Sequence, residues 1–171
     1  MEKVILVDEK DNPVGEMEKM EAHKKGLLHR CFSIFIFNQA GELLLQKRAK
    51  EKYHSGGLWS NTCCSHPAPL ENTLDAAHRR LEEEMGIDCE IKETYTFIYK
   101  AKLDNDLTEY EYDHVFVGNC NSDPKPNPEE VEDWKWVDLK WLEEDMKNNP
   151  QNYTYWLKDC FSDVVKKIKG L

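Results

Sequence analysis

An apolar run near the start of the chain limits the folds that this sequence can adopt. Residues 31–37 read CFSIFIF, so only Ser33 interrupts a stretch rich in β-branched and aromatic side chains. A run of this length is typical of a strand buried in a sheet and is far too short to cross a bilayer. The turn-forming sequence NQAG follows, and apolar residues resume at once. The pattern predicts a hairpin with strands over 28–37 and 42–48.

The clearest helix is predicted over residues 71–85. Gly86 stands where a C-terminal cap belongs. Apolar residues recur at helical spacing along this segment: Leu74, Ala77, Leu81 and Met85. The helix therefore has one face suited to packing on a sheet.

Helical and extended patterns are mixed along the rest of the chain. Further strands are predicted over residues 3–8, 58–64, 95–101, 109–117 and 134–137. Further helices are predicted over residues 16–25, 139–146 and 153–168. At 171 residues the chain is long enough for one ordinary hydrophobic core. We therefore expect one mixed α/β (α+β) domain over residues 1–171.

Composition excludes several classes of function. The net charge of −10 disfavours nucleic-acid binding, which needs a basic face. The chain has no apolar segment suited to a membrane span and no recognisable targeting segment, so we expect a cytoplasmic protein without a membrane partner. Its six cysteines form no C-x-x-C pair, which favours reduced thiols. The oligomeric state is left open.

The charges of the predicted helix follow a distinctive spacing. Glu71 is followed after seven residues by Arg79, and then by the sequence RLEEEMGI. Such a cluster is usually just a solvated face, but this spacing resembles the Nudix box, whose carboxylates hold Mg²⁺ on a diphosphate. Ser65 replaces the first Gly of the box, and Arg80 replaces a Glu that Nudix hydrolases use for metal and water. The resemblance implies diphosphate binding and puts hydrolysis in doubt.

Histidines and carboxylates suggest a second metal site. A lone His is usually structural or solvated, but His66 lies two residues after Cys64, and Glu109 and Glu111 share one face of a predicted strand. Two neighbouring carboxylates repel each other unless a proton or cation lies between them. Together with His23 and His29 they make an octahedral or five-coordinate site for Mn²⁺ or Zn²⁺ plausible.

The order and spacing of several motifs resemble those of the type I isopentenyl diphosphate isomerases along nearly the whole chain. The motifs are HKKGLLHR, NTCCSHP, RRLEEEMG, TEYEYDHVF and YTYW. The resemblance implies a Nudix-like mixed β-sheet between helices. It also implies Mn²⁺ or Zn²⁺ at His23, His29, His66, Glu109 and Glu111, and Mg²⁺ between the diphosphate and Glu84. The implied diphosphate contacts are Lys19, Arg48, Lys52 and Arg80, whereas His54, His78 and His114 match no known role.

The implied reaction moves the double bond of isopentenyl diphosphate to give dimethylallyl diphosphate. One group must protonate the alkene to a tertiary carbocation, and a second must remove another proton. The residues that match are Glu111, assisted by the hydroxyl of Tyr99, as acid, and Cys64 as thiolate base. Trp156 offers an indole face to the cation, although a Trp on a C-terminal helix is more often part of a core.

Two other functions are open at this stage. A Nudix pyrophosphohydrolase would release phosphate or a nucleoside monophosphate, and Arg80 in place of Glu argues against it. A metal-binding or prenyl-diphosphate-binding module without activity has no need of a thiol and a metal-bound carboxylate together.

Overall fold

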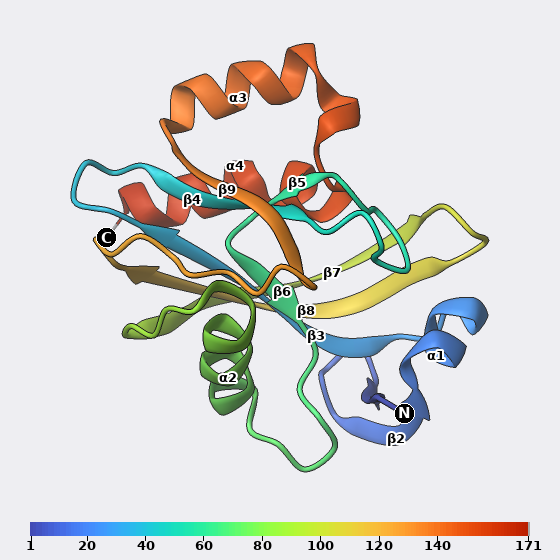
Figure 1. Ribbon diagram of the computed structural model, residues 1–171. Helices are drawn as coiled ribbons and strands as arrows, with labels where there is room; N and C mark the ends of the chain where they lie inside the picture. The colour runs from blue at the N-terminus through green and yellow to red at the C-terminus, as the bar shows by residue number, and fades with distance from the viewer. Residues whose placement is uncertain (171) are drawn as a thin grey trace.

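The computed structural model describes residues 1–170 and has a central sheet with helices on both faces (Figure 1). The strands are β1 (Lys3–Val7), β2 (Pro13–Glu18), β3 (His29–Phe37), β4 (Leu43–Arg48), β5 (Trp59–Ser60), β6 (Cys63–Ser65), β7 (Ile91–Lys102), β8 (Thr108–Asn119) and β9 (Val131–Val137). The helices are α1 (Lys19–Lys25), α2 (Thr73–Met85), α3 (Leu139–Asn148), the 3₁₀ helix η1 (Pro150–Asn152) and α4 (Tyr155–Lys169). Within this part of the chain no helix is long and apolar enough to span a membrane.

Strand β3, which contains the apolar run, is the centre of the sheet. Its whole length pairs in parallel with β8, from His29 opposite Glu111 to Phe37 opposite Asn119. Its other edge is shared by β1, β6 and β4 in succession. Both edges are therefore occupied, as expected for a strand that is apolar on both faces.

Alternate residues of β3 face different helices. Phe32, Ile34 and Ile36 belong to the cluster that includes residues of α2. Phe35 and Phe37 belong to the cluster that includes residues of α3 and α4. The sheet is thus the middle layer of three, with α2 on one side and α3 and α4 on the other (Figure 1).

The mixed α/β fold and the long helices are confirmed, but helix α2 buries a slightly different face. Its buried residues include Ala76, Ala77 and Leu81, whereas Leu74 is exposed. The helix ends at Gly86 in the left-handed conformation, with φ of 63°. A Cβ atom there would lie 2.3 Å from the carbonyl oxygen of Lys125, so both backbone and space require glycine.

The prediction of a helix over residues 16–25 is wrong for its first turn. Residues Pro13–Glu18 form β2, in which Glu16 lies opposite Ile5 of β1. Glu18 ends the strand and caps α1, because its side chain accepts hydrogen bonds from the backbone of Met20 and Glu21. Pairing with β1 therefore overrides the local helical pattern.

The predicted hairpin of residues 28–37 and 42–48 is also largely wrong. β3 and β4 pair only at Phe37 and Leu43, and β4 instead pairs with β9 and β5. The turn is where it was expected, but the two strands diverge after it. The reason is that β6 and β1 occupy the edge of β3 that a hairpin would use.

The single strand predicted over residues 58–64 is divided in two. β5 pairs with β4, whereas β6 pairs with β3. Asn61 lies between them, and its side-chain amide donates hydrogen bonds to the carbonyl oxygens of Ile34 and Cys63. These bonds satisfy backbone groups at the point where the chain passes from one strand to another.

Substitution of Leu81 tests the packing of α2. Leu81→Ala should lower the free energy of unfolding by about 2–5 kcal/mol, because a fully buried leucine is removed from the core. The matched control is Glu82→Ala on the exposed side of the same helix, which should change it by less than about 0.5 kcal/mol. Urea denaturation followed by circular dichroism measures both, and equal effects would contradict the assigned face.

Candidate active site

One face of the sheet changes from apolar to polar halfway along β3 and β8. Phe35 and Val115 are packed in the core below α4. The alternating positions before them on the same face are polar or carry thiols, and all are buried: His29, Cys31, Ser33, Glu109, Glu111 and Asp113. A buried cluster of this kind is stable only if its groups satisfy one another or bind a ligand.

Strand register brings the central groups together. His29 lies beside Glu111 through the parallel pairing of β3 and β8, and Tyr99 lies beside Glu111 through the antiparallel pairing of β7 and β8. The Tyr99 hydroxyl donates to Glu109 at 2.9 Å and also contacts Glu111. Glu111 Oε1 is 3.2 Å from His29 Nε2 and 2.9 Å from His66 Nε2.

Helix α1 and the end of β6 supply the other two predicted imidazoles. His23 is fully buried in α1, and its Nε2 lies 4.0 Å from Glu111 Oε1. His66 directly follows β6. The donor atoms of His23, His29, His66 and Glu111 all lie within 4.8 Å of one another. Glu109, the fifth predicted ligand, groups with His23 and His54 instead.

The hydrogen bonds of these histidines suit a divalent cation. His23 Nδ1 and His29 Nδ1 bond the carbonyl oxygens of Lys19 and Leu27 at 2.7 and 2.8 Å. A carbonyl oxygen only accepts, so each Nδ1 carries a proton, and in the neutral form of each ring Nε2 directs a lone pair toward Glu111. Lone pairs facing carboxylate oxygens repel unless a proton or a cation lies between them. The donor set therefore fits a bound metal ion.

The pKa shifts of these residues show which of them are charged when no metal ion is bound. Burial lowers the pKa of His23 and of His66 to about 4, so both imidazoles are neutral, which is the form that binds metals. Burial opposes ionisation of Glu111, but hydrogen bonds from His29 and His66 outweigh it and hold its pKa well below the usual range. Burial also acts on His29, yet the bond and charge of Glu111 raise its pKa. Glu111 and His29 thus each favour the charged form of the other.

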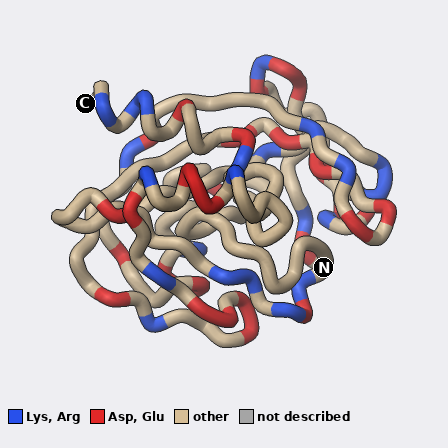
Figure 2. Tube along the Cα trace, turned by 90° about the horizontal axis from the view of Figure 1, so that it is seen from above, with Lys and Arg blue, Asp and Glu red and all other residues tan. Residues whose placement is uncertain are grey.

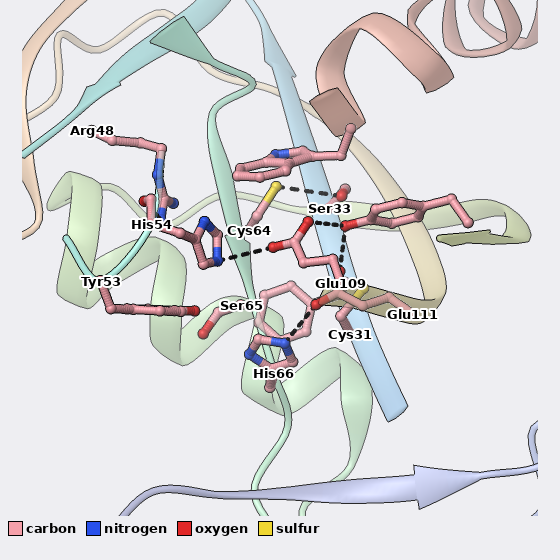
Figure 3. A pocket seen from close by; sticks show the side chains of 13 residues that line it. Cys31, Ser33, Arg48, Tyr53, His54, Cys64, Ser65, His66, Glu109 and Glu111 are labelled. Atoms are coloured by element: carbon pink, nitrogen blue, oxygen red, sulfur yellow. Dashed lines mark hydrogen bonds and ion pairs between the residues drawn. The ribbon is translucent and has the colours of Figure 1, made fainter. Parts of the chain in front are cut away.

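The thiol of Cys64 faces the same cavity as Glu111 (Figure 3). Its sulfur lies 3.1 Å from Asn61 Oδ1 and 3.4 Å from the Ser33 hydroxyl. The Asn61 amide nitrogen is already bonded to two carbonyl groups, so its oxygen is fixed toward the thiol. Burial, followed by the neighbouring carboxyl of Asp113, raises the pKa of Cys64. In the metal-free state Cys64 is therefore a thiol.

Trp156 and Arg48 form another part of the wall of this cavity, whose volume is about 30 Å³. The Trp156 indole is 2 % exposed and donates to the Ser60 hydroxyl at 2.9 Å. The Arg48 guanidinium lies 5.2 Å from the centre of the indole ring, and its Nη2 donates to the carbonyl oxygen of His54. An aromatic face and a cation thus border a small, partly open space.

The other basic residues predicted to bind diphosphate are held by carboxylates. Lys19 pairs with Glu2 at 3.0 Å. Lys52 and Arg80 both contact Glu130, which lies 78 and 50 residues after them in the sequence. Along the whole trace, residues of both charges are interspersed (Figure 2). An anionic ligand would have to take the place of one or more of these carboxylates.

The charged residues of α2 divide into two groups. Arg79 bonds both oxygens of Glu71, at 2.7 and 2.8 Å, and so ties the helix to the loop before it. Arg80 pairs with the buried Glu84 at 2.6 Å, and Gln46 donates to the other oxygen of Glu84 at 3.0 Å. The first group is structural, whereas the second lies on the buried side of the helix.

The structure adds three residues that the sequence did not single out. His54 lies 3.1 Å from Glu109, Asn61 holds the thiol of Cys64, and Glu130 joins Lys52 to Arg80. His54 comes from the loop between β4 and β5, fifty-five residues before Glu109. No periodicity relates such a loop to a strand. Its only sequence signal was a histidine within a polar, glycine-containing loop.

Comparison with solved structures supports the fold class. The structure aligns with the MutT protein of Methanosarcina mazei with a TM-score of 0.68 and 20% identity, over 83% of this chain and 96% of the other. It aligns with a Nudix hydrolase from Nitrosomonas europaea with a TM-score of 0.62 and 17% identity, over 80% and 88% of the two chains. The NUDIX domain model matches residues 27–157, and the chain is therefore a Nudix protein.

Curated relatives narrow the family further. "Isopentenyl-diphosphate Delta-isomerase 2" of Aromatoleum aromaticum is 55% identical over 96% of this chain and 87% of the relative. The protein of the same name from Photorhabdus laumondii is 55% identical over 94% of this chain and 91% of the relative. The chain belongs to the isopentenyl-diphosphate Delta-isomerase family.

The raised pKa of Cys64 predicts slow alkylation in the metal-free protein. Iodoacetamide reacts with the thiolate, so modification of Cys64 should be slower than that of a free thiol at pH 7.5 and should accelerate continuously up to pH 10. Peptide mapping by mass spectrometry separates Cys64 from the other cysteines. A rate that levels off below pH 8 would show a thiolate and contradict the prediction.

Proposed function

We propose that the cavity lined by Cys64 and Glu111 is where this isomerase interconverts isopentenyl diphosphate and dimethylallyl diphosphate. The observation that carries the proposal is the presence of these two proton-handling groups in one cavity, from different strands. An allylic double-bond shift needs one group to add a proton and another to remove one. The names of the relatives supply the substrate and the product.

In the proposed forward reaction Glu111 delivers a proton to the terminal alkene carbon, with Tyr99 bonded to its carboxyl group. Cys64 then removes a proton from the carbon nearer the diphosphate. Without metal, Cys64 favours the thiol and Glu111 the carboxylate. These are the forms that a forward turnover leaves behind and that the reverse reaction starts from. A forward cycle therefore ends with Cys64 losing one proton to solvent and Glu111 gaining one from solvent.

Trp156 is proposed to stabilise the carbocation. Its buried indole is held in place by the bond to Ser60, so the ring presents a fixed surface to the cavity. A cation over an indole face is stabilised by about 2 kcal/mol or more when water is excluded. Arg48 near the same ring carries a competing positive charge, which an anionic diphosphate would neutralise.

A divalent cation, Mn²⁺ or Zn²⁺, is proposed to be held by three imidazoles and two carboxylates: His23, His29, His66, Glu109 and Glu111. When bound it would supply a fixed positive charge that makes the carboxyl group of Glu111 more acidic. The imidazoles hold this carboxylate in place, and Tyr99 bonds it from the other side. Glu111 is therefore both anchored and within the reaction cavity.

The diphosphate is proposed to bind near Arg80, with Mg²⁺ at Glu84 and with Lys19, Arg48 and Lys52 as further contacts. A second hollow adjoins the cavity, because His66 lines both, and Arg80 and Glu2 line this hollow. The carboxylates of Glu2 and Glu130 now pair with Lys19, Lys52 and Arg80. A diphosphate also offers anionic oxygens to these cations, and it carries a greater negative charge than a carboxylate.

Hydrolysis of a nucleotide is less well supported. Arg80 stands where Nudix hydrolases carry a carboxylate for metal and water, and its guanidinium is bound to Glu84 and Glu130. A binding module without activity would not need a thiol and a carboxylate lining one cavity. Release of phosphate or a nucleoside monophosphate from nucleotides, without isomerisation, would favour the hydrolase.

Isomerisation in D₂O tests the assigned pair. The wild-type protein with isopentenyl diphosphate and Mg²⁺ should form deuterated dimethylallyl diphosphate, as measured by NMR. Cys64→Ala should lower kcat by about 10²–10⁴-fold, because a proton-transfer group is lost. Cys89→Ser, at a half-buried thiol outside the cavity, is the matched control and should retain activity. Ordinary turnover by Cys64→Ala would remove the thiol from the mechanism.

Removal of metal tests the proposed centre. Dialysis against a chelator should abolish turnover and lower the unfolding temperature, because buried imidazoles and carboxylates lose their common cation. Restoring Mn²⁺ or Zn²⁺ together with Mg²⁺ should restore both properties, whereas Mg²⁺ alone should not. Full activity of a protein free of transition metal, checked by elemental analysis, would contradict the centre.

A further inference from the structure

A second group of donor atoms adjoins the first. The donor atoms of His23, His54 and Glu109 lie within 4.8 Å of one another, and all three residues are buried. His23 belongs to this group and also to the group of His29, His66 and Glu111. His54 is the member to which neither the motifs nor the proposed reaction gives a task.

The contact of His54 with Glu109 has the spacing of two ligands on one ion. His54 Nε2 lies 3.1 Å from Glu109 Oε1, yet this nitrogen makes no hydrogen bond among the described residues (Figure 3). Ligands about 2.1 Å from a metal and at right angles to each other lie about 3 Å apart. The two contacts of Glu111 with imidazole nitrogens, at 2.9 and 3.2 Å, have the same spacing.

The His54 ring is held so that Nε2 points at the carboxylates. Its Nδ1 lies 3.2 Å from the Ser55 hydroxyl. That oxygen can accept a hydrogen bond from a protonated Nδ1, which leaves the lone pair of Nε2 free. Arg48 bonds the carbonyl oxygen of His54, and the rings of Tyr53 and Trp156 contact the imidazole at about right angles. Metal-bound histidines commonly donate their second ring proton in this way.

The two groups of donors can serve only one ion. The Nδ1–H group of His23 donates a hydrogen bond to the carbonyl oxygen of Lys19. Nε2 is therefore the only nitrogen of this ring that is free to bind a metal ion. One imidazole nitrogen binds one metal ion at a time. Because both groups depend on this nitrogen, they cannot hold two ions at once, and one ion bound by all the donors would draw His54 and Glu109 toward the first group.

We propose that His54 is a sixth protein ligand of the divalent cation, bound through Nε2 beside Glu109. The inference rests on the metal centre proposed above. Six protein donors satisfy an octahedral ion and leave no position for substrate or water. The cation then acts on the reaction only through its protein ligands, chiefly Glu111, and the alkene does not contact it.

The affinity of the protein for metal ions tests whether His54 is a ligand, and it does so independently of catalytic activity. Binding of Mn²⁺ and Zn²⁺ to the metal-free full-length protein is measured by competition with a chelating dye. His54→Ala should weaken binding by at least about tenfold. The matched control is His78→Ala, a histidine paired with Asp88 on the outer side of α2, which should bind like the wild type.

A second variant separates a ligand from a hydrogen-bond donor. His54→Gln keeps a donor for Glu109 but is a much poorer metal ligand, so it should bind as weakly as His54→Ala. In the Co²⁺-substituted protein both variants should also show stronger visible absorption than the wild type, because the ion becomes five-coordinate. Circular dichroism verifies that each variant is folded.

Three results would overturn the ligand assignment. Wild-type affinity in His54→Ala would show that the residue is not needed, and recovery of affinity in His54→Gln would show that it only orients Glu109. Unchanged Co²⁺ spectra in both variants would likewise exclude a sixth ligand. If the wild-type protein itself binds neither Mn²⁺ nor Zn²⁺, the metal centre fails together with the role of His54.

Discussion

The parallel pairing of β3 with β8 is the constraint on which the site depends. It buries the apolar run of β3 and, through the same register, fixes His29 beside Glu111. Because side chains alternate across a strand, the register also decides which residues face α2 and which face the cavity. A shift by one residue would turn Glu109 and Glu111 into the apolar core, where ionised carboxylates are strongly unfavourable. Burial of the core and assembly of the site therefore depend on the same pairing.

The site concentrates buried polar groups that would destabilise an ordinary core. Its imidazoles and carboxylates satisfy one another only in part: His23 Nε2 and His54 Nε2 have no hydrogen-bond partner among the described residues, and burial raises the pKa of Glu109 well above its usual range. A cation bound among these groups would relieve both problems. The polar cluster is covered by α1 and the loop after β4, which supply His23 and His54 to its carboxylates, and it lies apart from the apolar half of β3.

The scaffold is shared with Nudix hydrolases, but the proposed chemistry depends on a few substituted positions. Arg79 and Glu71 still fix the loop to α2, so the part of the box that builds the fold is retained. Arg80 replaces a carboxylate and pairs with Glu84 and Glu130. The groups proposed to handle protons lie on β6 and β8, outside the helix of the box. Fold and reaction are thus encoded by different residues.

The sequence by itself determined the mixed α/β class, the helix over residues 71–85 and the final two helices, because these depend on local periodicity. Motif order also identified the family and the residues proposed for metal and catalysis. Only the tertiary structure decided that β3 pairs with β8 and not with β4, that residues 16–18 join a strand, and that His54 lies beside Glu109. Each of these results depends on contacts between segments distant in sequence, and neither local propensity nor spacing along the chain encodes such contacts.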